Sequence, residues 1–298
     1  MCGPLYTVFC FCFPTSSAKR HRHGFFFFCR DDEEQEAEEE EISTWFGSVS
    51  FSSNRVLIHD SFAKTTETIE LSAPNDPIQQ VVSTHLHVAI LMNTGRIALR
   101  RIDDFERTPT ILEPSPDETT LIVSTSKAIH RVQRDQKTSK IQKILEDSEG
   151  ISEDVKHEVV GFPWPVRVVD AKGGNDFLMF LDSTGNLFSM GTGTRGELGV
   201  GLIRHVAEPV HIEQLAGIPI EKVVCGGWHT VALTTGGDVY AATEMYPVLF
   251  EEFPENIGEE EPVVQDIEVT EHTTTVYINN QKFIIGNDFV DITEFELK

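Results

Sequence analysis

Positive charge is scarce in this chain of 298 residues. Lys and Arg together number 24 against 48 Asp and Glu, which gives a net charge of −24 at pH 7. Contacts to nucleic-acid phosphates depend on Lys and Arg, and anionic membranes attract basic segments. The composition therefore argues against direct binding to nucleic acid or to a membrane surface. It favours a basic protein partner, such as a histone tail.

Cysteine is sparse and unevenly placed. Four of the five Cys residues lie in the first thirty residues, and Cys225 stands alone in the rest of the chain. A disulfide framework needs Cys residues throughout the fold that it stabilises, so a reducing compartment, the nucleus or the cytoplasm, is expected. The Cys and His residues near the N-terminus match no common zinc spacing, so no metal site is predicted there. This group comprises Cys10, Cys12, His21, His23 and Cys29.

Catalytic motifs are missing as well. The chain contains no Gly-x-Ser-x-Gly, no phosphate-binding loop, no His-Glu-x-x-His and no Cys-x-x-Cys. Cys225 falls inside an expected strand and is interpreted as an inert core residue, not as a nucleophile. Acidic residues are numerous, but no pair of them stands out. The sequence therefore predicts neither an enzyme nor a bound cofactor.

Long apolar runs are absent, since no eighteen consecutive apolar residues occur, and no transmembrane helix is expected. The apolar stretch at residues 5–13 leaves a secretory signal open, although basic residues follow it instead of preceding it. Residues 31–41 read DDEEQEAEEEE, with nine acidic residues in eleven positions. Such a block repels itself and buries no apolar surface, so residues 1–41 are predicted to be a disordered tail.

From Ile42 onward, short β-branched runs alternate with clusters of Gly, Asn, Asp, Ser and Thr, which is typical of strands and turns. One pattern recurs in this region: an apolar pair, a polar or glycine stretch, a His, an apolar strand, a Thr/Gly turn and a second strand. The two best copies are residues 81–99 and 223–240, with further copies at 173–191 and 267–286 and a weak fifth at 119–132.

Three His residues are assigned to one place in the repeat: His87, His229 and His272, with Asp176 near that place in the third copy. Residues at repeated positions usually serve the architecture of the repeat. We therefore expect each imidazole to bond a loop backbone at the strand entrance, with a ligand or a catalytic base as the alternative. Gly226 and Gly227 are expected to permit close backbone approach. A phosphate cradle is disfavoured because no helix N-terminus follows them. 

Each copy of the repeat describes a β-hairpin. Thr184-Gly185 and Gly236-Gly237 supply the positive φ that a tight hairpin turn needs. A lone hairpin is at best marginally stable in water, so the copies must pack against one another. Four short strands in each forty to fifty residues are typical of a propeller blade. Residues 42–298 are thus predicted to form an all-β propeller, with the clearest repeats at residues 171–240.

The segment CGGWHTVAL from Cys225 to Leu233, followed by GDVY, resembles the repeat of the regulator of chromosome condensation family. Residues 190–199, MGTGTRGELG, resemble it too, with Met190, Gly193 and Glu197 where the family usually has Trp, Asn and Gln. The likeness is nearest to the short, eroded, chromatin-linked members of the family. The family propeller usually has seven blades, whereas this region has room for about five at the observed spacing. A degenerate propeller of about five to seven blades, or an incomplete ring, is expected.

Two functions remain open at this stage. The first is a non-catalytic scaffold that binds a basic or chromatin-associated protein through loops at one propeller face. The second, implied by the resemblance alone, is guanine-nucleotide exchange on a Ran-like small GTPase. Arg195 and Glu197, in the loop 191–199, and Trp228 are the candidate contact residues. Solvated loop charges and packing within a blade are the alternative interpretations for them.

Overall fold

The computed structural model describes residues 40–44, 47–61, 64–70, 76–104, 108–114, 118–148, 159–201, 204–242, 246–250, 263–279, 281–286 and 292–295. All of them belong to one compact unit, Ala37–Lys298. The other unit, Met1–Glu36, lies outside the described residues, and so does most of the predicted tail. Glu40 and Glu41, the last two residues of the acidic run, are the first residues of strand β1.

Six four-stranded antiparallel sheets make up the described part of the chain, and each is built from one continuous stretch of sequence. Blade 1 contains β1 (Glu40–Ser43), β2 (Gly47–Phe51), β3 (Arg55–Asp60) and β4 (Thr65–Glu70). Blade 2 contains β5 (Ile78–Ser83), β6 (His87–Met92), β7 (Ile97–Arg101) and β8 (Thr110–Leu112). Blade 3 contains β9 (Thr119–Ser124), β10 (Ala128–Arg134), β11 (Ser139–Glu146) and β12 (Val159–Gly161).

The other three blades follow the same order. Blade 4 contains β13 (Val168–Gly173), β14 (Phe177–Asp182), β15 (Leu187–Gly193) and β16 (Arg204–His211). Blade 5 contains β17 (Ile220–Cys225), β18 (Thr230–Thr234), β19 (Val239–Ala242) and β20 (Val248–Leu249). Blade 6 contains β21 (Val264–Val269), β22 (Thr273–Ile278), β23 (Gln281–Gly286) and β24 (Ile292–Phe295). The 3-10 turn η1 (Glu213–Leu215) is the only helical element in the part of the chain that the structure describes.

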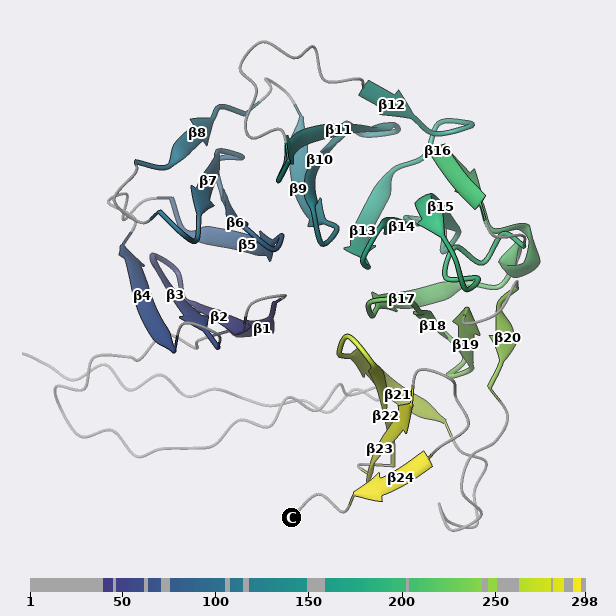
Figure 1. The fold of residues 1–298 in the computed structure, drawn as a ribbon. Helices are drawn as coiled ribbons and strands as arrows, with labels where there is room; N and C mark the ends of the chain where they lie inside the picture. The colour runs from purple at the N-terminus through teal and green to yellow at the C-terminus, as the bar shows by residue number, and fades with distance from the viewer. Residues whose placement is uncertain are drawn as a thin grey trace, which may run out of the picture. The chain divides into compact units, whose positions relative to one another are not determined.

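The six sheets form a β-propeller, with the first strand of each blade nearest the central channel (Figure 1). The prediction of an all-β propeller is confirmed, and the six blades fall within the predicted range of five to seven. In the described segments, no helix is long and apolar enough to span a membrane.

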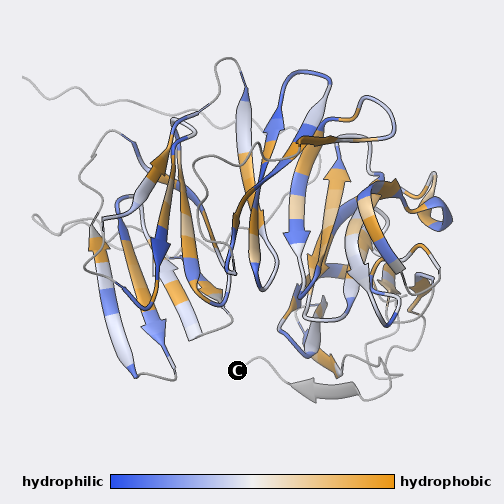
Figure 2. Ribbon diagram, turned by 45° about the horizontal axis from the view of Figure 1, so that its top comes forward, coloured by the Kyte–Doolittle hydropathy of each residue, from blue (hydrophilic) through white to orange (hydrophobic). Residues whose placement is uncertain are grey.

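Hydrophobic clusters hold neighbouring blades together. Five clusters of buried residues each join two consecutive blades, from blades 1 and 2 to blades 5 and 6. The apolar residues, orange in Figure 2, lie along the middle of the strands. Among the described residues, no such cluster joins blade 6 to blade 1. The stability of the propeller therefore comes mainly from apolar surface that is buried between successive blades.

The position of a blade decides the pattern of its second strand. In β6 (HVAILM) and β14 (FLMFLD) every residue is buried, because a neighbouring blade covers both faces of the sheet. In β2 (GSVSF) the burial alternates: Val49 and Phe51 are buried, whereas Ser48 and Ser50 are half-buried. Blade 1 thus has one apolar face, packed on blade 2, and one face rich in serine. The alternation is the reason why the sequence repeat did not reveal this blade.

The repeat predicted from sequence corresponds to the first three strands of blades 2, 4, 5 and 6. In each of these blades the first strand carries a register shift at the same place, for example between Ile220 and Lys222. In blades 2, 4 and 5 the hairpin between the second and third strands turns at a glycine of positive φ, for example 86° at Gly185 and 90° at Gly237, whereas in blade 6 Asn279 takes the positive φ, at 50°. Blade 3, the weak fifth copy, lacks the shift in its first strand.

The propeller has two opposite faces, which are named here after the turns that they carry. The AB face carries the turns between the first and second strands, at residues 84–86, 125–127, 174–176, 226–229 and 270–272. The BC face carries the turns between the second and third strands, at residues 93–96, 135–138, 183–186 and 235–238. Because the strands run antiparallel, these two sets of turns lie at opposite ends of the channel.

Candidate functional site

Backbone hydrogen bonds link the turns of the AB face from blade to blade. The amide of His85 donates to the Ser126 carbonyl (2.8 Å), and the amide of Ser126 donates to the Asn175 carbonyl (3.0 Å). The amide of Asn175 donates to the Gly227 carbonyl and that of Gly227 to the Glu271 carbonyl, both at 3.0 Å. Five successive turns are thus joined through equivalent positions. This belt makes the AB face a rigid platform for side chains.

An aromatic stack stands on this platform at the turns of blades 5 and 6. The rings of Trp228 and His272 lie 5.6 Å apart and nearly parallel, at 8°. The Arg195 guanidinium, from the loop after β15, lies 5.2 Å from the Trp228 ring centroid. Trp228 is half-buried, whereas Arg195 and His272 are exposed. Of the predicted contact residues, Arg195 and Trp228 therefore lie together at the surface, and His272 joins them.

Glu197 does not belong to this surface. Only 2% of the residue is exposed, and its carboxylate accepts hydrogen bonds from the amides of Thr194 (2.9 Å) and Arg195 (2.5 Å). Its carbonyl accepts the Thr230 hydroxyl at 3.0 Å. The prediction of Glu197 as a contact residue is therefore corrected: its carboxylate satisfies the loop backbone and holds Arg195 in place.

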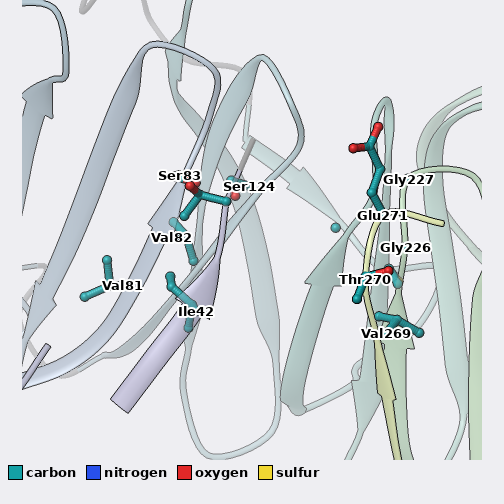
Figure 3. Close-up of a pocket in the computed structure, with 13 residues that line it drawn as sticks. Ile42, Val81, Val82, Ser83, Ser124, Gly226, Gly227, Val269, Thr270 and Glu271 are labelled. Carbon is teal, nitrogen blue, oxygen red and sulfur yellow. The ribbon is translucent and has the colours of Figure 1, made fainter. Parts of the chain in front are cut away.

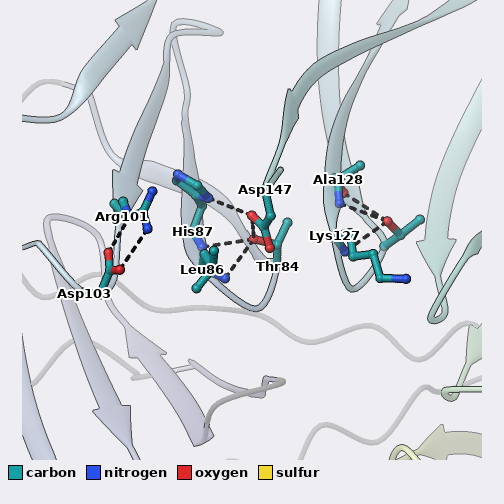
Figure 4. A network of polar contacts seen from close by, with 9 residues as sticks. Thr84, Leu86, His87, Arg101, Asp103, Lys127, Ala128 and Asp147 are labelled. Atoms are coloured by element: carbon teal, nitrogen blue, oxygen red, sulfur yellow. Dashed lines mark hydrogen bonds and ion pairs between the residues drawn. The ribbon is translucent and has the colours of Figure 1, made fainter. Parts of the chain in front are cut away.

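His87 and His229 both bond the following blade. The His87 Nδ1 lies 2.7 Å from Asp147 Oδ1, which also accepts the Thr84 hydroxyl at 2.7 Å (Figure 4). His229 is 1% exposed, and its Nε2 lies 3.1 Å from the Thr274 Oγ1. Burial lowers the pKa of His229 to about 4, so this imidazole is neutral at pH 7. The partners are side chains of the next blade, where a loop backbone was expected.

His272 occupies a different position from the other two. In each turn, the amide of the first residue bonds the carbonyl three residues on, as Gly226 does with His229 at 2.9 Å. In blade 6 the same bond runs from Thr270 to Thr273 at 2.8 Å, so Thr273 is the equivalent of His229. His272 lies one residue earlier, at the place of Trp228, and is exposed. Its assignment as a repeat histidine is therefore corrected.

Gly226 and Gly227 lie where the turns of adjacent blades meet. A Cβ atom at Gly226 would lie 2.1 Å from the His229 ring and 2.7 Å from the Thr270 carbonyl oxygen. A Cβ atom at Gly227 would lie 3.0 Å from the Glu271 side chain and 3.1 Å from that of Asn175. Gly226 in particular leaves no room for a side chain, because the blades approach closely there.

The channel opens at the AB face into a cavity of about 230 Å³ (Figure 3). First strands and AB turns of all six blades line it, with Ile42, Val82 and Val269 among the apolar side chains. Cys225 also lines the cavity, and burial raises the pKa of its thiol to about 12. A thiol that stays protonated at pH 7 is a poor nucleophile, which agrees with its interpretation as inert.

Within the described ranges, no three His, Cys, Asp or Glu side chains converge on a point where they could hold a metal ion. The Cys and His residues near the N-terminus lie outside those ranges. The charge of the chain resides in the propeller unit: residues 37–298 contain 43 acidic and 20 basic residues, a net charge of −23. The propeller is therefore the acidic part of the molecule.

Comparison with known proteins identifies the repeat. The family model described as "Regulator of chromosome condensation (RCC1) repeat" matches residues 184–233. RCC1 domain-containing protein 1 of Mus musculus is 39% identical over 75 residues, which cover 25% of this chain and 20% of that protein. The chain contains an RCC1 repeat. The RCC1 match begins in the BC turn of blade 4 and ends in β18 of blade 5, so one sequence repeat straddles two blades.

The fold of the chain resembles that of several solved structures. Human WBSCR16 superposes with a TM-score of 0.56 at 14% identity, over 74% of this chain and 65% of that one. Prp20p of Saccharomyces cerevisiae, whose structure is described with its binding properties to Gsp1p and histones, superposes with a TM-score of 0.52 at 16% sequence identity. The superposition covers 70% of this chain and 57% of Prp20p. The mouse and human RCC1 domain-containing proteins 1 are matched over only about a fifth of their length. The binding partners of these proteins are therefore not established for this chain.

Sequence reasoning missed several residues of the AB face. Asp147 and Thr274, the partners of His87 and His229, lie 60 and 45 positions away and follow no motif. Asp147 is one of 48 acidic residues, so its role is not visible before the blades are placed. The stacking of His272 on Trp228 had a possible signal, because the two residues occupy the same position of adjacent AB turns.

Proposed function

We propose that the chain is a non-catalytic scaffold that binds a basic protein partner, of the histone or chromatin-associated class, at its AB face. The observation that carries this proposal is the exposed stack of Arg195, Trp228 and His272 on turns that are joined by backbone hydrogen bonds. Trp and Arg are enriched among the residues that dominate binding energy at protein interfaces. We expect the chain to act in the nucleus or in the cytoplasm, where it can meet a partner of this class.

The rigidity of the stack favours binding. The amide of Gly227, next to Trp228, is held by the Glu271 carbonyl, and Arg195 is held through Glu197. Side chains that are already ordered lose less entropy when a partner binds. Arg195 takes part in none of the ion pairs among the described residues, so its guanidinium donors are free to bond carbonyl oxygens of a partner.

Charge supplies the preference for a basic partner. The propeller unit has a net charge of −23, and the exposed carboxylate of Glu271 lies 3.8 Å from the His272 ring of the stack. Such a field attracts a cationic protein over a distance of about 8 Å at physiological ionic strength and acts mainly on the association rate. The aromatic stack then contributes the short-range contacts.

Purified core histones are a suitable probe for this proposal. Binding to the full chain is measured by biolayer interferometry for the wild type, Trp228→Ala and Trp164→Ala. Trp164 is a matched control, because it is exposed to 44% but follows β12 at the BC face. Trp228→Ala is expected to weaken binding about tenfold, as loss of an interface Trp often does. Trp164→Ala is expected to leave it unchanged. Equal effects of the two substitutions would contradict the placement of the interface.

The exchange function is tested in a separate assay. The release of fluorescent GDP from purified Ran is followed with and without catalytic amounts of the chain. No acceleration is expected from a scaffold. Acceleration that grows with the amount of the chain would overturn the scaffold proposal in favour of guanine-nucleotide exchange.

A further inference from the structure

Cations gather on blade 3 although the propeller as a whole is acidic. Residues 127–146, the hairpin of β10 and β11, contain six basic and two acidic residues, whereas the whole chain has twice as many acidic as basic residues. The six are Lys127, Arg131, Arg134, Lys137, Lys140 and Lys143. Arg167, in the connection to blade 4, lies close enough to affect the pKa of Arg134. The hairpin of blade 3 is therefore basic within an acidic molecule, with Lys127 at its AB-face end and Lys137 at its BC-face end.

A pocket of about 440 Å³ lies on the BC face between blades 3 and 4, and Lys137 is the one cation of the hairpin that lines it. Lys137 lines it from the hairpin turn of blade 3, and Arg167 and Trp164 line it from the connection to blade 4. Gln136 and residues of the turn that follows Asp182 form the remaining wall, together with Asp182 itself, which is 5% exposed. Two cations and one large aromatic ring thus share a single concavity.

Trp164 is presented rigidly. It is exposed to 44% and stands between Pro163 and Pro165, whose rings restrict the backbone on both sides. Its ring contacts Phe188 at 5.2 Å and 61°, and His211 at 5.3 Å and 70°. One part of the indole is therefore anchored on the blade and the other part is left to solvent. An ordered, half-exposed Trp is typical of a binding anchor.

The nearby carboxylates do not pair with these cations. Asp135 accepts the hydroxyl of Thr138 and the amides of Lys137 and Thr138, all at 2.6 Å, and these bonds lower the pKa of Asp135 to about 2. Asp182 accepts hydrogen bonds from Thr184 and Asn186 within its own turn. None of the ion pairs among the described residues includes Lys137 or Arg167. The carboxylates shape the turns, and the two cations remain available.

We propose that this pocket binds a short acidic segment of a partner protein that carries an apolar side chain. The carboxylates of the segment pair with Lys137 and Arg167, and its apolar side chain packs on the exposed part of Trp164. This site goes beyond the proposed function, since it lies on the other face and selects the opposite charge.

A protein segment fits the pocket better than a nucleic acid does. Affinity for nucleic acid grows with the number of phosphates that the protein neutralises along the strand. Here a few cations are surrounded by a propeller of net charge −23, so phosphates outside the pocket would meet repulsion. A short segment with a few carboxylates stays within about 8 Å of the cations, the range in which local charge acts at physiological salt.

The test uses the full chain and a fluorescein-labelled peptide of eight residues, with six carboxylates around a central Leu-Phe pair. Fluorescence anisotropy is measured for the wild type, Trp164→Ala and the double variant Lys137→Glu/Arg167→Glu. Both variants are expected to weaken binding at least tenfold. Trp228→Ala and Arg195→Glu, on the AB face, are expected to bind the peptide like the wild type. The double variant changes two exposed side chains, so it remains informative if Trp164→Ala fails to fold.

Two further probes complete the design. A peptide in which Ser replaces the central Leu-Phe pair is expected to bind at least fivefold more weakly, because it has nothing to pack on Trp164. A twelve-residue thymidine oligonucleotide is expected not to bind. Peptide binding that neither BC-face variant alters would overturn the proposal, and so would oligonucleotide binding that depends on Trp164. A wild-type chain that binds the peptide but no histones would contradict the AB-face proposal alone.

Discussion

The imidazole of His229 in blade 5 lies 3.1 Å from the hydroxyl of Thr274 in blade 6, with both residues almost completely buried. His87 makes the corresponding contact from blade 2 to Asp147, beyond β11 of blade 3. The repeated His is thus a connection between successive blades. It acts beside the backbone belt of the AB turns, so side chain and main chain together secure the junctions of blades 2 and 3 and of blades 5 and 6.

Removal of the His229 contact should destabilise the propeller. His229→Ala is expected to lower the free energy of unfolding by roughly 1–3 kcal/mol, because a buried polar partner is left unsatisfied. Thr274→Val, which removes only the hydroxyl, is expected to cost about 1 kcal/mol. Urea denaturation measures both values. Histone binding should fall only as far as folding does. Normal stability with abolished binding would instead make His229 a contact residue.

Stability should depend on pH through the same residue. The pKa of His229 is about 4 in the folded protein against an ordinary value of 6.5, so the unfolded state binds the proton more readily. Stability is therefore lost as the pH falls from 6.5 toward 4. Between pH 7 and pH 5, His229→Gln should lose about 2 kcal/mol less than the wild type, given about 1.4 kcal/mol for each pKa unit. Parallel losses in urea titrations of the two proteins would disprove this role.

Gly173 should tolerate no side chain. A Cβ atom there would lie 1.9 Å from the Ser124 carbonyl oxygen of blade 3. Gly173→Ala is expected to cost at least about 2 kcal/mol, because one of the two blades must move. Gly161→Ala is the control: nothing lies within 4 Å of its Cβ position, and the residue is also in a strand. A small, equal effect of the two substitutions on the melting temperature would refute the close approach.

Removal of residues 1–36 should leave the propeller intact. The compact unit starts at Ala37, and β1 starts at Glu40, so all six blades remain. The melting temperature is expected to stay within about 2 °C of that of the full chain. Removal of residues 1–43 is the contrasting variant, since it deletes β1, and with it Ile42, which packs on the cluster of blades 1 and 2. A drop of several degrees for the shorter deletion would show that the tail belongs to the fold.

Histone binding should weaken as salt rises. Affinity is expected to fall progressively between about 50 and 300 mM NaCl, because screening shortens the reach of surface charge. The effect should persist in a chain of residues 37–298, since residues 1–36 carry five acidic and four basic residues and contribute little net charge. Interferometry over a salt series measures this. An affinity indifferent to salt would remove the electrostatic part of the proposal.

Local pattern was sufficient to predict the class of fold. Short apolar strands alternate with turn residues, and Gly185 and Gly237 each mark a hairpin turn. Both features depend on backbone geometry within about ten residues. These features are visible in a linear sequence, and so is the repeat around His87 and His229. Blade 1 was not recognised in the sequence because one face of its sheet is polar. Ser48 and Ser50 interrupt the apolar run that marks the second strand of a blade covered on both faces.

Contacts between blades were decided only by the tertiary structure. Glu197 looked like a loop charge, but the curl of its loop buries it against its own backbone amides. His272 looked like a repeat histidine, but a one-residue difference in register places it on Trp228. Asp147, Thr274 and the pocket around Trp164 join segments of different blades. Because such pairings depend on how the blades stack and not on neighbours in sequence, the sequence alone determined the propeller and its repeat, and packing determined which side chains meet.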